Sequence, residues 1–368
     1  MEYYIYVTKD CNYNCKYCDV LPIARQSGSL KNAPNIGETV NYILADKTCA
    51  DTEKTVVFYG GEPLMNSSFI REFISQTEGR GLKYLLHTNG SLLKEADPLI
   101  LKHMDYIFIS IDGYRDVQDI YRGSVGSFDA IMQNVHEIKS QVKGQIMARI
   151  TLPISPDVSL FKAVMGVIDT FDYVYCQVEN DAFSRPVKLL QQFKSNFSDD
   201  LKKLVEYWIV QMRKGIVKNI VPFQTIVSSL LFNRVSEDRP RCGVGLTTVY
   251  VDTDGVCYVC DKLLGNQEFG AGSLRNGIRF RNNVKCTDLR TQCRVCDIRF
   301  VCGGRCLPQL LYYPDNKFQF YCDIQKAVVR KISGTLPKIE EMLKEGIVRQ
   351  EDLDIEAHPI EKCTELIF

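Results

Sequence analysis

Cysteine thiols are the side chains in this sequence with the clearest chemical potential. Fifteen of the 368 residues are cysteine. Three lie between residues 11 and 18, nine lie between residues 242 and 322, and Cys49, Cys176 and Cys363 fall elsewhere. No basic-then-apolar leader opens the sequence, so disulfide bonds, which belong to oxidising compartments, are not the expected use of these thiols. The clustering predicts two separate metal or cluster sites, with Cys49 and Cys176 as small core residues and Cys363 as an exposed thiol.

The first cysteine group has the spacing Cys11-x3-Cys15-x2-Cys18. Three thiolates in one loop can bind three irons of a four-iron cubane, which leaves the fourth iron open to a ligand from another molecule. For this motif considered by itself, a zinc site or chance spacing is the alternative.

Three further motifs follow the second, third and fourth expected strands. Gly60-Gly61-Glu62-Pro63 offers backbone groups that a ligand can approach closely, and a carboxylate for an ammonium group. Thr88-Asn89-Gly90 and Ser110-Ile111-Asp112-Gly113 add polar side chains after the next two strands. Each motif alone is typical of an ordinary strand-to-helix turn. All three in this order, behind the cysteine motif, favour a shared ligand.

The cysteine triplet and these motifs together resemble the radical S-adenosylmethionine superfamily, which usually has an aromatic residue where Tyr17 stands. The resemblance implies that Cys11, Cys15 and Cys18 hold a [4Fe-4S] cluster whose open iron takes the amino and carboxylate groups of S-adenosylmethionine. Reductive cleavage would then give methionine and a 5'-deoxyadenosyl radical, which takes a hydrogen atom from the substrate. The residues implied to bind the cofactor are Tyr17, Gly60, Gly61, Glu62, Asn89, Ser110 and Asp112.

The second cysteine group contains the dense array Cys293-x2-Cys296-x5-Cys302-x3-Cys306. A zinc ribbon is the alternative for this array considered alone. With Cys242 and Gly255-x4-Cys260 upstream and Cys322 downstream, its order and spacing resemble the SPASM domain, which carries two auxiliary iron-sulfur clusters. The resemblance implies three [4Fe-4S] clusters in all. Cys242, Cys260 and Cys306 would hold the first auxiliary cluster, and Cys293, Cys296, Cys302 and Cys322 the second.

The first auxiliary cluster is one ligand short on this assignment. The fully ligated sulfatase-maturase type has a further cysteine a few residues upstream of Cys242, where Ser236 lies here. Cys257 or Cys286 could supply the ligand, or the position could be open to substrate. The alternative for each of these two cysteines is a thiol that binds no cluster, and this alternative is slightly favoured for Cys257.

Asp261 directly follows Cys260. In sulfatase-maturating relatives an aspartate at this place is proposed to take a proton from the substrate, so the resemblance makes Asp261 a candidate catalytic base. A turn or cap aspartate is the alternative. The stretch from Gly265 to Phe269 looks more like the peptide maturases that build crosslinks.

The elements that must position these residues alternate between strand and helix. Strict alternation predicts parallel strands joined by crossover helices, for which Ser127–Val142 shows the helical spacing. Six units are too few for a closed eight-stranded barrel. We therefore predict an α/β fold with a partial (β/α)6 barrel, followed by a small cysteine-rich SPASM domain. The expected strands are Tyr3–Thr8, Thr55–Tyr59, Lys83–Thr88, Tyr106–Ile111, Gln145–Leu152 and Tyr173–Val178.

The predicted domain limits are a barrel over 1–187, a helical linker over 188–240, the SPASM domain over 241–330, and a C-terminal helix and tail over 331–368. A helical pattern runs over Ile324–Lys344. The linker's apolar face consists of Leu201, Leu204, Val205, Trp208 and Met212.

Composition narrows the class of protein. The 45 basic and 45 acidic residues balance, so charge gives no reason to expect a nucleic acid or an anionic membrane as partner. No apolar run is long enough to span a bilayer. We expect a cytoplasmic protein.

The function that the resemblance implies is maturation of a ribosomally synthesised peptide by a thioether or carbon–carbon crosslink or a related oxidation. An electron donor such as flavodoxin or ferredoxin would be needed. Because the sequence begins at the first strand, we expect no N-terminal leader-binding domain. Formylglycine formation of the anaerobic sulfatase-maturase type is the alternative. A non-catalytic metal-binding scaffold is more remote, since it would not need the strand-end motifs.

Overall fold

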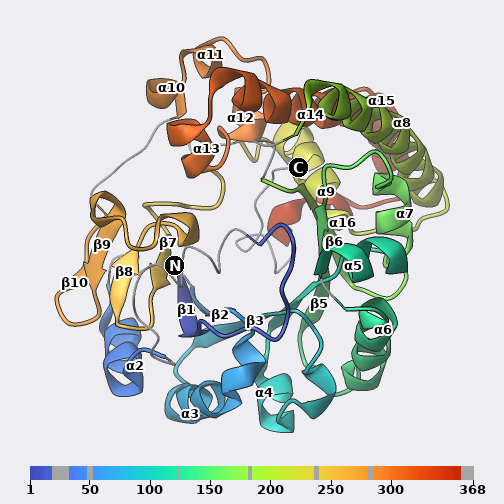
Figure 1. Cartoon of the computed structure of the whole chain (residues 1–368). Coiled ribbons are helices and arrows are strands. Elements are labelled where there is room, and N and C mark those ends of the chain that lie inside the picture. Colours follow the sequence, from blue (N-terminus) through green and yellow to red (C-terminus); the bar gives the residue numbers. More distant parts are fainter. Residues whose placement is uncertain are drawn as a thin grey trace. The chain divides into compact units, whose positions relative to one another are not determined.

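The computed structural model describes residues 1–18, 33–47, 53–122, 124–180, 185–235, 240–280 and 286–357. Cys49, Ser236, Cys363 and the side chain of Cys286 lie outside the described residues. The chain divides into two compact units. Their helices and strands are labelled in Figure 1. The first unit comprises Met1–Ile111, Arg115–Met147 and Gly243–Asn283, and the second comprises Asp112–Tyr114, Ala148–Cys242 and Val284–Phe368. The predicted domain limits stay predictions.

All six predicted strands are present, each within one residue of its predicted ends. They are β1 (Glu2–Thr8), β2 (Lys54–Gly60), β3 (Leu82–Thr88), β4 (Tyr106–Ser110), β5 (Gln145–Leu152) and β6 (Tyr173–Val178). Every residue of β1 is buried, as is typical of a strand inside a parallel sheet. The α/β partial barrel is thereby confirmed.

The cysteine-rich region adds four short strands that the sequence analysis did not predict: β7 (Thr248–Val251), β8 (Val256–Tyr258), β9 (Gly270–Ser273) and β10 (Gly277–Ile278). The sheet order is β10-β9-β8-β7-β1-β2-β3-β4-β5-β6. β1 pairs in parallel with both β2 and β7, whereas β7, β8, β9 and β10 pair antiparallel in succession. Strands of two to four residues are too short to show a period in the sequence.

The helices of the first unit are α2 (Ile36–Ala45), α3 (Ser67–Thr77), α4 (Pro98–His103), α5 (Arg115–Arg122) and α6 (Ser127–Ile138). Phe58 of β2 packs edge-to-face against Phe73 of α3, with ring centroids 5.7 Å apart, so even-numbered positions of β2 face this helix. The prediction of a helix over Ser127–Val142 is too long by four residues. Beyond Ile138 the chain turns, with Lys139–Gln141 exposed.

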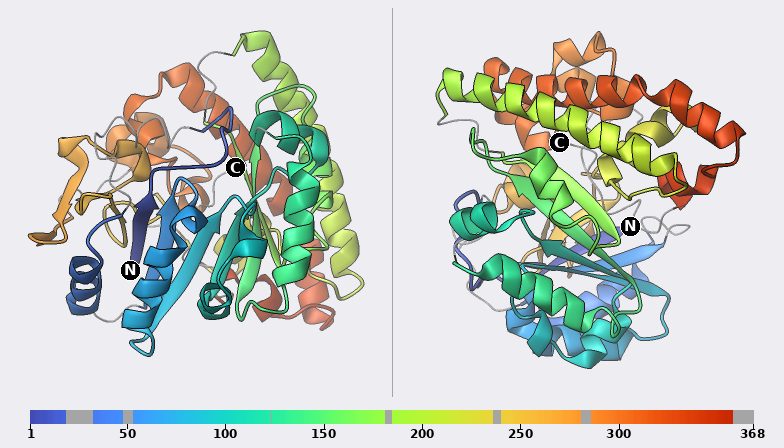
Figure 2. Two further views of the ribbon diagram at one scale, coloured as in Figure 1. Left: turned by 60° about the horizontal axis from the view of Figure 1, so that its bottom comes forward. Right: turned by 90° about the vertical axis from the view of Figure 1, so that its right-hand side faces the viewer.

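The second unit is mostly helical. Its elements are α7 (Leu160–Met165), α8 (Val187–Met212), α9 (Val221–Leu231), α10 (Cys286–Leu289), α11 (Thr291–Arg294), α12 (Arg299–Cys302), α13 (Leu307–Tyr312), α14 (Asp315–Ser333), α15 (Leu336–Lys344) and α16 (Gln350–Leu353). The apolar face predicted for the linker is buried in α8. Figure 2 shows α8 lying alongside α14, and Phe193 and Phe320 meet between them with ring centroids 6.3 Å apart.

The helical stretch predicted over Ile324–Lys344 contains parts of two helices. Helix α14 begins nine residues earlier, at Asp315, and ends at Ser333 with Gly334 as its C-cap. Helix α15 then starts with Pro337 in its first turn. Proline lacks the backbone donor that continues a helix but suits a first turn, so it marks a new start here. Among the described residues, no helix is long and apolar enough to cross a membrane.

Candidate active site

The first cysteine group lies in the loop that leaves β1, and this loop is attached to the end of α5. The Lys16 amide donates to the carbonyl of Tyr121 at 2.8 Å, and Tyr17 stacks on the Tyr121 ring with centroids 6.5 Å apart. The Arg122 guanidinium lies 5.4 Å from the centroid of Tyr17. Tyr17 is therefore held by aromatic and cation–π contacts in the first unit.

Glu62 connects the turn after β2 to the end of β3. Its carboxylate is buried and accepts hydrogen bonds from the Thr88 hydroxyl (2.8 Å), the Asn89 amide (2.7 Å) and the Leu64 amide (3.1 Å). Burial raises the pKa of Glu62, and these three donors oppose the rise. A carboxylate has about four acceptor positions, so one remains for a further donor such as an ammonium group. That role stays a prediction.

Asn89 brings this network to the cysteine loop. Its side-chain amide donates to Asn12 Oδ1 at 2.8 Å and lies 4.0 Å from Cys11 Sγ. Burial raises the pKa of the Cys11 thiol, and the nearby Glu62 and Cys18 act in the same direction. The predicted residues Cys11, Cys18, Glu62 and Asn89 thus come together in the first unit.

The two glycines of the turn are required by the chain itself. Gly60 has φ +127°, and a side chain there would overlap the carbonyl oxygen of Thr8. A side chain at Gly61 would overlap that of Asp10. The amides of Gly61 and Glu62 donate to those two carbonyls at 3.0 and 2.8 Å. The turn therefore packs directly on the segment that leads into the cysteine loop, and the predicted approach of these glycines to a ligand is untested.

Ser110 and Asp112 do not fall in the same unit. Ser110 ends β4 in the first unit and is half-buried. Asp112 belongs to the second unit, is fully buried, and accepts a hydrogen bond from the Thr151 amide at 3.2 Å. Their roles toward the cofactor stay predictions.

The sheet face turned away from α3 carries an aromatic row that sequence reasoning missed. Tyr6 and Tyr59 are register partners with centroids 5.3 Å apart, and Tyr59 stacks on His87 at 5.2 Å. Burial raises the pKa of Tyr6, whose hydroxyl has no hydrogen-bond partner among the described residues. The sequence did contain a signal for Tyr59. This residue directly precedes the Gly60-Gly61 turn, and the alternation of side chains along a strand places it on the opposite face from Phe58.

Asp261 joins this row from the cysteine-rich region. It begins the short 3-10 helix η3 (Asp261–Leu263), where its carboxylate accepts from the Lys262 amide (2.9 Å) and the Cys260 thiol (3.3 Å). The Tyr59 hydroxyl donates to its second oxygen at 3.2 Å. Asp261 is thus more than a local turn residue, since β2 orients it from 202 positions away.

A buried ion pair at the ends of β1 and β7 was also missed. Lys9 Nζ lies 2.8 and 3.0 Å from the two carboxylate oxygens of Asp252, and both side chains are almost fully buried. Lys9 precedes Cys11 by two residues, and Asp252 directly follows β7. The parallel pairing of these strands places both residues at the same edge of the sheet.

Four cysteines of the second group line one cavity in the second unit, and they are the set predicted for the second auxiliary cluster. They are Cys293, Cys296, Cys302 and Cys322. Burial raises the pKa of Cys302, and that of Cys322 to about 12, while the guanidinium of Arg305 opposes both shifts. Four converging thiols with a nearby cation fit a thiolate-bound cluster.

Among the described residues, no three His, Cys, Asp or Glu side chains lie close enough to hold a single metal ion. In a four-iron cluster each thiolate binds a different iron, so its ligands stand farther apart than those of one zinc.

The remaining cysteines divide between the units. Cys242 and Cys306 belong to the second unit and Cys260 to the first, so their joint ligation stays a prediction. Cys257 is buried in β8, where burial raises its pKa to about 12, and Cys176 is buried in β6. These last two surroundings are those of core thiols.

Comparison with known proteins shows what this chain resembles. Residues 5–155 match the Radical SAM superfamily. A serine-type anaerobic sulfatase-maturating enzyme of Bacteroides thetaiotaomicron is 24% identical over 85% of this chain and 82% of its own length. The structure of anSMEcpe with bound AdoMet is similar with a TM-score of 0.72 and 16% identity, covering 94% of this chain and 99% of that one.

A second solved structure, SuiB of Streptococcus suis bound to precursor peptide SuiA, has a TM-score of 0.57 and 14% identity, covering 86% of this chain and 75% of that one. At these identities the two structures establish the fold. The superfamily match covers the cysteine triplet, the turn after β2 and the ends of β3 and β4. Residues 5–155 of this chain are therefore a radical S-adenosylmethionine domain, which uses S-adenosylmethionine and a [4Fe-4S] cluster.

Proposed function

We propose that this enzyme modifies a residue of a ribosomally synthesised peptide, with a thioether or carbon–carbon crosslink or a related oxidation as the product. The observation that carries the proposal is the four-cysteine cavity of the second unit. We assign it as a cluster site additional to the Cys11–Cys18 loop. Similar folds also occur with bound peptides, namely anSMEcpe with the Cp18Cys peptide and SuiB with SuiA.

The proposed cofactors are S-adenosylmethionine and three [4Fe-4S] clusters. Cys11, Cys15 and Cys18 hold the first, and the cavity cysteines hold the second auxiliary cluster. Cys242, Cys260 and Cys306 hold the first auxiliary cluster, whose fourth ligand is Cys257, Cys286 or the substrate. The core-like burial of Cys257 supports the other two choices. A flavodoxin or ferredoxin supplies the electrons.

When bound, the first cluster and S-adenosylmethionine supply the chemistry that removes a hydrogen atom from the substrate. The chain's own residues prepare the site. Glu62 fixes the ends of β2 and β3 and keeps one acceptor position for the cofactor's ammonium group. Tyr59 orients the carboxylate of Asp261, which takes a proton from the substrate. The aromatic row beside them excludes water.

Formylglycine formation of the sulfatase-maturase type is the second candidate. Asp261 and the likeness to the Bacteroides enzyme favour it. The absence of a cysteine shortly upstream of Cys242 disfavours it.

Anaerobic reconstitution tests the cofactors. We expect about twelve irons per chain, as three cubanes require. Replacing Cys15 and Cys18 with alanine should remove about four irons and abolish 5'-deoxyadenosine formation. Replacing Cys293 and Cys296 should also remove about four irons but leave some S-adenosylmethionine cleavage. Cys176→Ala, at a buried core thiol, is the matched control and should change neither quantity. Bound zinc, or undiminished nucleoside in the first variant, would refute the assignment.

The product distinguishes the two candidates. Candidate peptides, including cysteine- and serine-containing sulfatase-type peptides, are incubated with the reduced enzyme and analysed by mass spectrometry before and after a carbonyl-reactive hydrazine. A crosslink removes two hydrogens and leaves the product unreactive to hydrazine. An aldehyde that forms a hydrazone would instead establish formylglycine formation.

A further inference from the structure

Two guanidinium groups are fixed next to Cys302 in the second unit. Arg305 is only 2% exposed and lines the cavity that the four cysteines share. Arg241 donates from Nε to the carbonyl of Val301 at 2.8 Å and from Nη2 to that of Phe300 at 3.1 Å. Phe300 and Val301 are the two residues directly before Cys302. Arginine stays protonated in proteins, so each group is a permanent positive charge.

Contacts with Gln309, Gln325 and Tyr321 orient Arg305. Its Nε donates to Gln309 Oε1 at 3.0 Å and its Nη1 to Gln325 Oε1 at 3.5 Å, while the guanidinium lies 5.4 Å from the centroid of the Tyr321 ring. Gln309 is itself fixed by Asn180 at 2.8 Å. These contacts set the orientation of the guanidinium.

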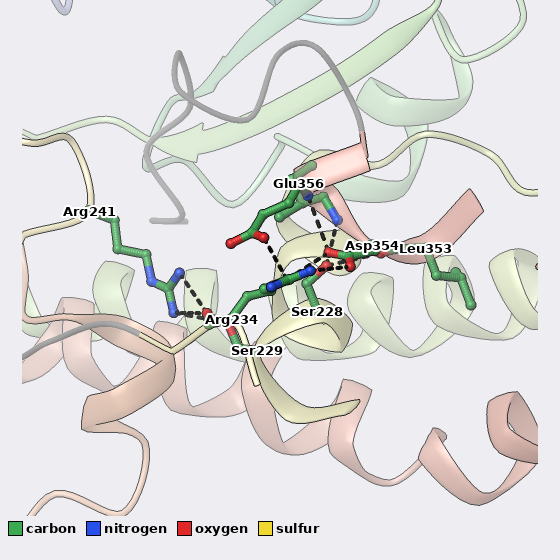
Figure 3. A network of polar contacts seen from close by, with 8 residues as sticks. Ser228, Ser229, Arg234, Arg241, Leu353, Asp354 and Glu356 are labelled. Carbon is green, nitrogen blue, oxygen red and sulfur yellow. Dashed lines mark hydrogen bonds and ion pairs between the residues drawn. The ribbon is translucent and has the colours of Figure 1, made fainter. Parts of the chain in front are cut away.

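Arg241 is anchored in a similar way. Besides the two carbonyls before Cys302, it donates to the Ser229 hydroxyl at 2.9 Å and to the carbonyl of Arg234 at 3.2 Å. Figure 3 shows Arg241 reaching toward Ser229 and Arg234, while the guanidinium of Arg234 turns to Asp354 and Glu356. The nearby carboxylates therefore pair with Arg234, whereas Arg241 donates to carbonyl and hydroxyl oxygens.

We propose that Arg305 and Arg241 raise the reduction potential of the cluster that the four cavity cysteines hold. A cluster bound by four thiolates is anionic, and reduction adds one more negative charge. A fixed cation stabilises the reduced form more than the oxidised form, and the effect is larger in a buried site of low dielectric constant. The inference rests on the proposed function, since it requires a cluster in this cavity.

The raised potential has a chemical consequence. After hydrogen abstraction the substrate radical loses one electron to the oxidised cluster and one proton to a base, which completes a two-electron oxidation. An electron acceptor of higher potential makes this transfer more favourable. Arg305 and Arg241 are thus positioning and tuning residues, and they do not touch the substrate in this proposal.

A potentiometric titration of the reconstituted full-length enzyme, followed by electron paramagnetic resonance, tests the proposal. The signal of the cavity cluster is identified by its loss in the Cys293→Ala, Cys296→Ala variant. Arg305→Gln should lower the reduced-to-oxidised ratio at the wild-type midpoint about tenfold, a shift of about 59 mV to lower potential for one electron. Arg241→Gln should shift it in the same direction by about threefold, because this residue is only half-buried.

Two variants separate charge from structure. Arg305→Lys keeps the positive charge and should stay within about twofold of the wild-type ratio. Arg330→Gln removes the same charge from the same unit at a side chain that is 65% exposed, where solvent screens it, and should also change the ratio less than about twofold.

Each outcome decides the proposal. An unchanged potential in Arg305→Gln with full iron content overturns it, as does a shift in Arg305→Lys as large as that in Arg305→Gln. If Arg305→Gln does not retain the cluster, Arg241→Gln decides, and an unchanged potential there overturns the proposal. If the Cys293→Ala, Cys296→Ala variant keeps all of its iron, the cavity holds no cluster, and the cofactor assignment of the proposed function fails first.

Discussion

The buried ion pair between Lys9 and Asp252 joins the two strands that flank the start of the cysteine loop. The side chains are 3% and 2% exposed, and Nζ lies 2.8 Å from Oδ1. Asp252→Asn removes the negative partner and leaves the ammonium group in a buried site. Breaking a buried pair in this way costs about 3 kcal/mol or more. At about 1.4 kcal/mol per factor of ten, local opening of β1 and β7 should become at least about 100-fold more frequent.

Hydrogen exchange with mass spectrometry measures this opening directly. Peptides from β1 and β7 should lose about 100-fold of their protection in Asp252→Asn. The fluorescence of Trp208, the single tryptophan, reports on α8 in the second unit and should not change. Glu38→Gln, which removes an exposed ion pair with Arg275 from the same unit, is the matched control and should cost less than about 1 kcal/mol.

The double variant Lys9→Met, Asp252→Asn sharpens the test. With both charges gone, the cost of burying the Lys9 ammonium group without the Asp252 carboxylate disappears, so the double variant should regain at least half of the lost protection. Asn keeps an oxygen for the Thr253 amide, which donates to Asp252 at 2.7 Å. If Asp252→Asn loses less than about threefold of its hydrogen-exchange protection, the reasoning is refuted. It is also refuted if the free-energy cost in the double variant equals the sum of the costs in the two single variants.

Two further predictions concern the first unit. The added methyl group of Gly61→Ala would overlap the carbonyl of Asp10, so we expect at least about a tenfold loss of S-adenosylmethionine affinity in equilibrium dialysis. Gly37→Ala in α2 is the control and should bind normally. Normal binding by Gly61→Ala would contradict this prediction. Hydrogen bonding to Glu78 raises the pKa of His103 above its ordinary 6.5, so this contact stabilises the fold below about pH 6.5 and weakens as pH rises through the folded pKa. Imidazole NMR titration should show the raised pKa in the wild type and its decrease in Glu78→Gln, and an unshifted value in the wild type would argue against the contact.

The barrel strands were readable from the sequence because buried parallel strands are short, nearly continuous apolar runs. The cysteine loop could be recognised in the sequence because a cubane loop needs thiols at close, fixed spacing, as in Cys11–Cys18. The strands β7 to β10 could not be predicted from the sequence, because each is too short to show a pattern. Two helix ends were not predicted. Helix α6 ends where the chain turns at Lys139, and helix α15 begins with Pro337 in its first turn.

By itself, then, the sequence determined the local features: strand positions, cysteine spacing and the polar residues at strand ends. The tertiary structure alone decided which distant side chains meet. Tyr59 reaches Asp261 across 202 positions and Lys9 reaches Asp252 across 243, because β7 pairs with β1 in parallel and brings the cysteine-rich region to that edge of the sheet. Such contacts depend on the register between strands far apart in the chain, and no spacing within a short segment encodes that register.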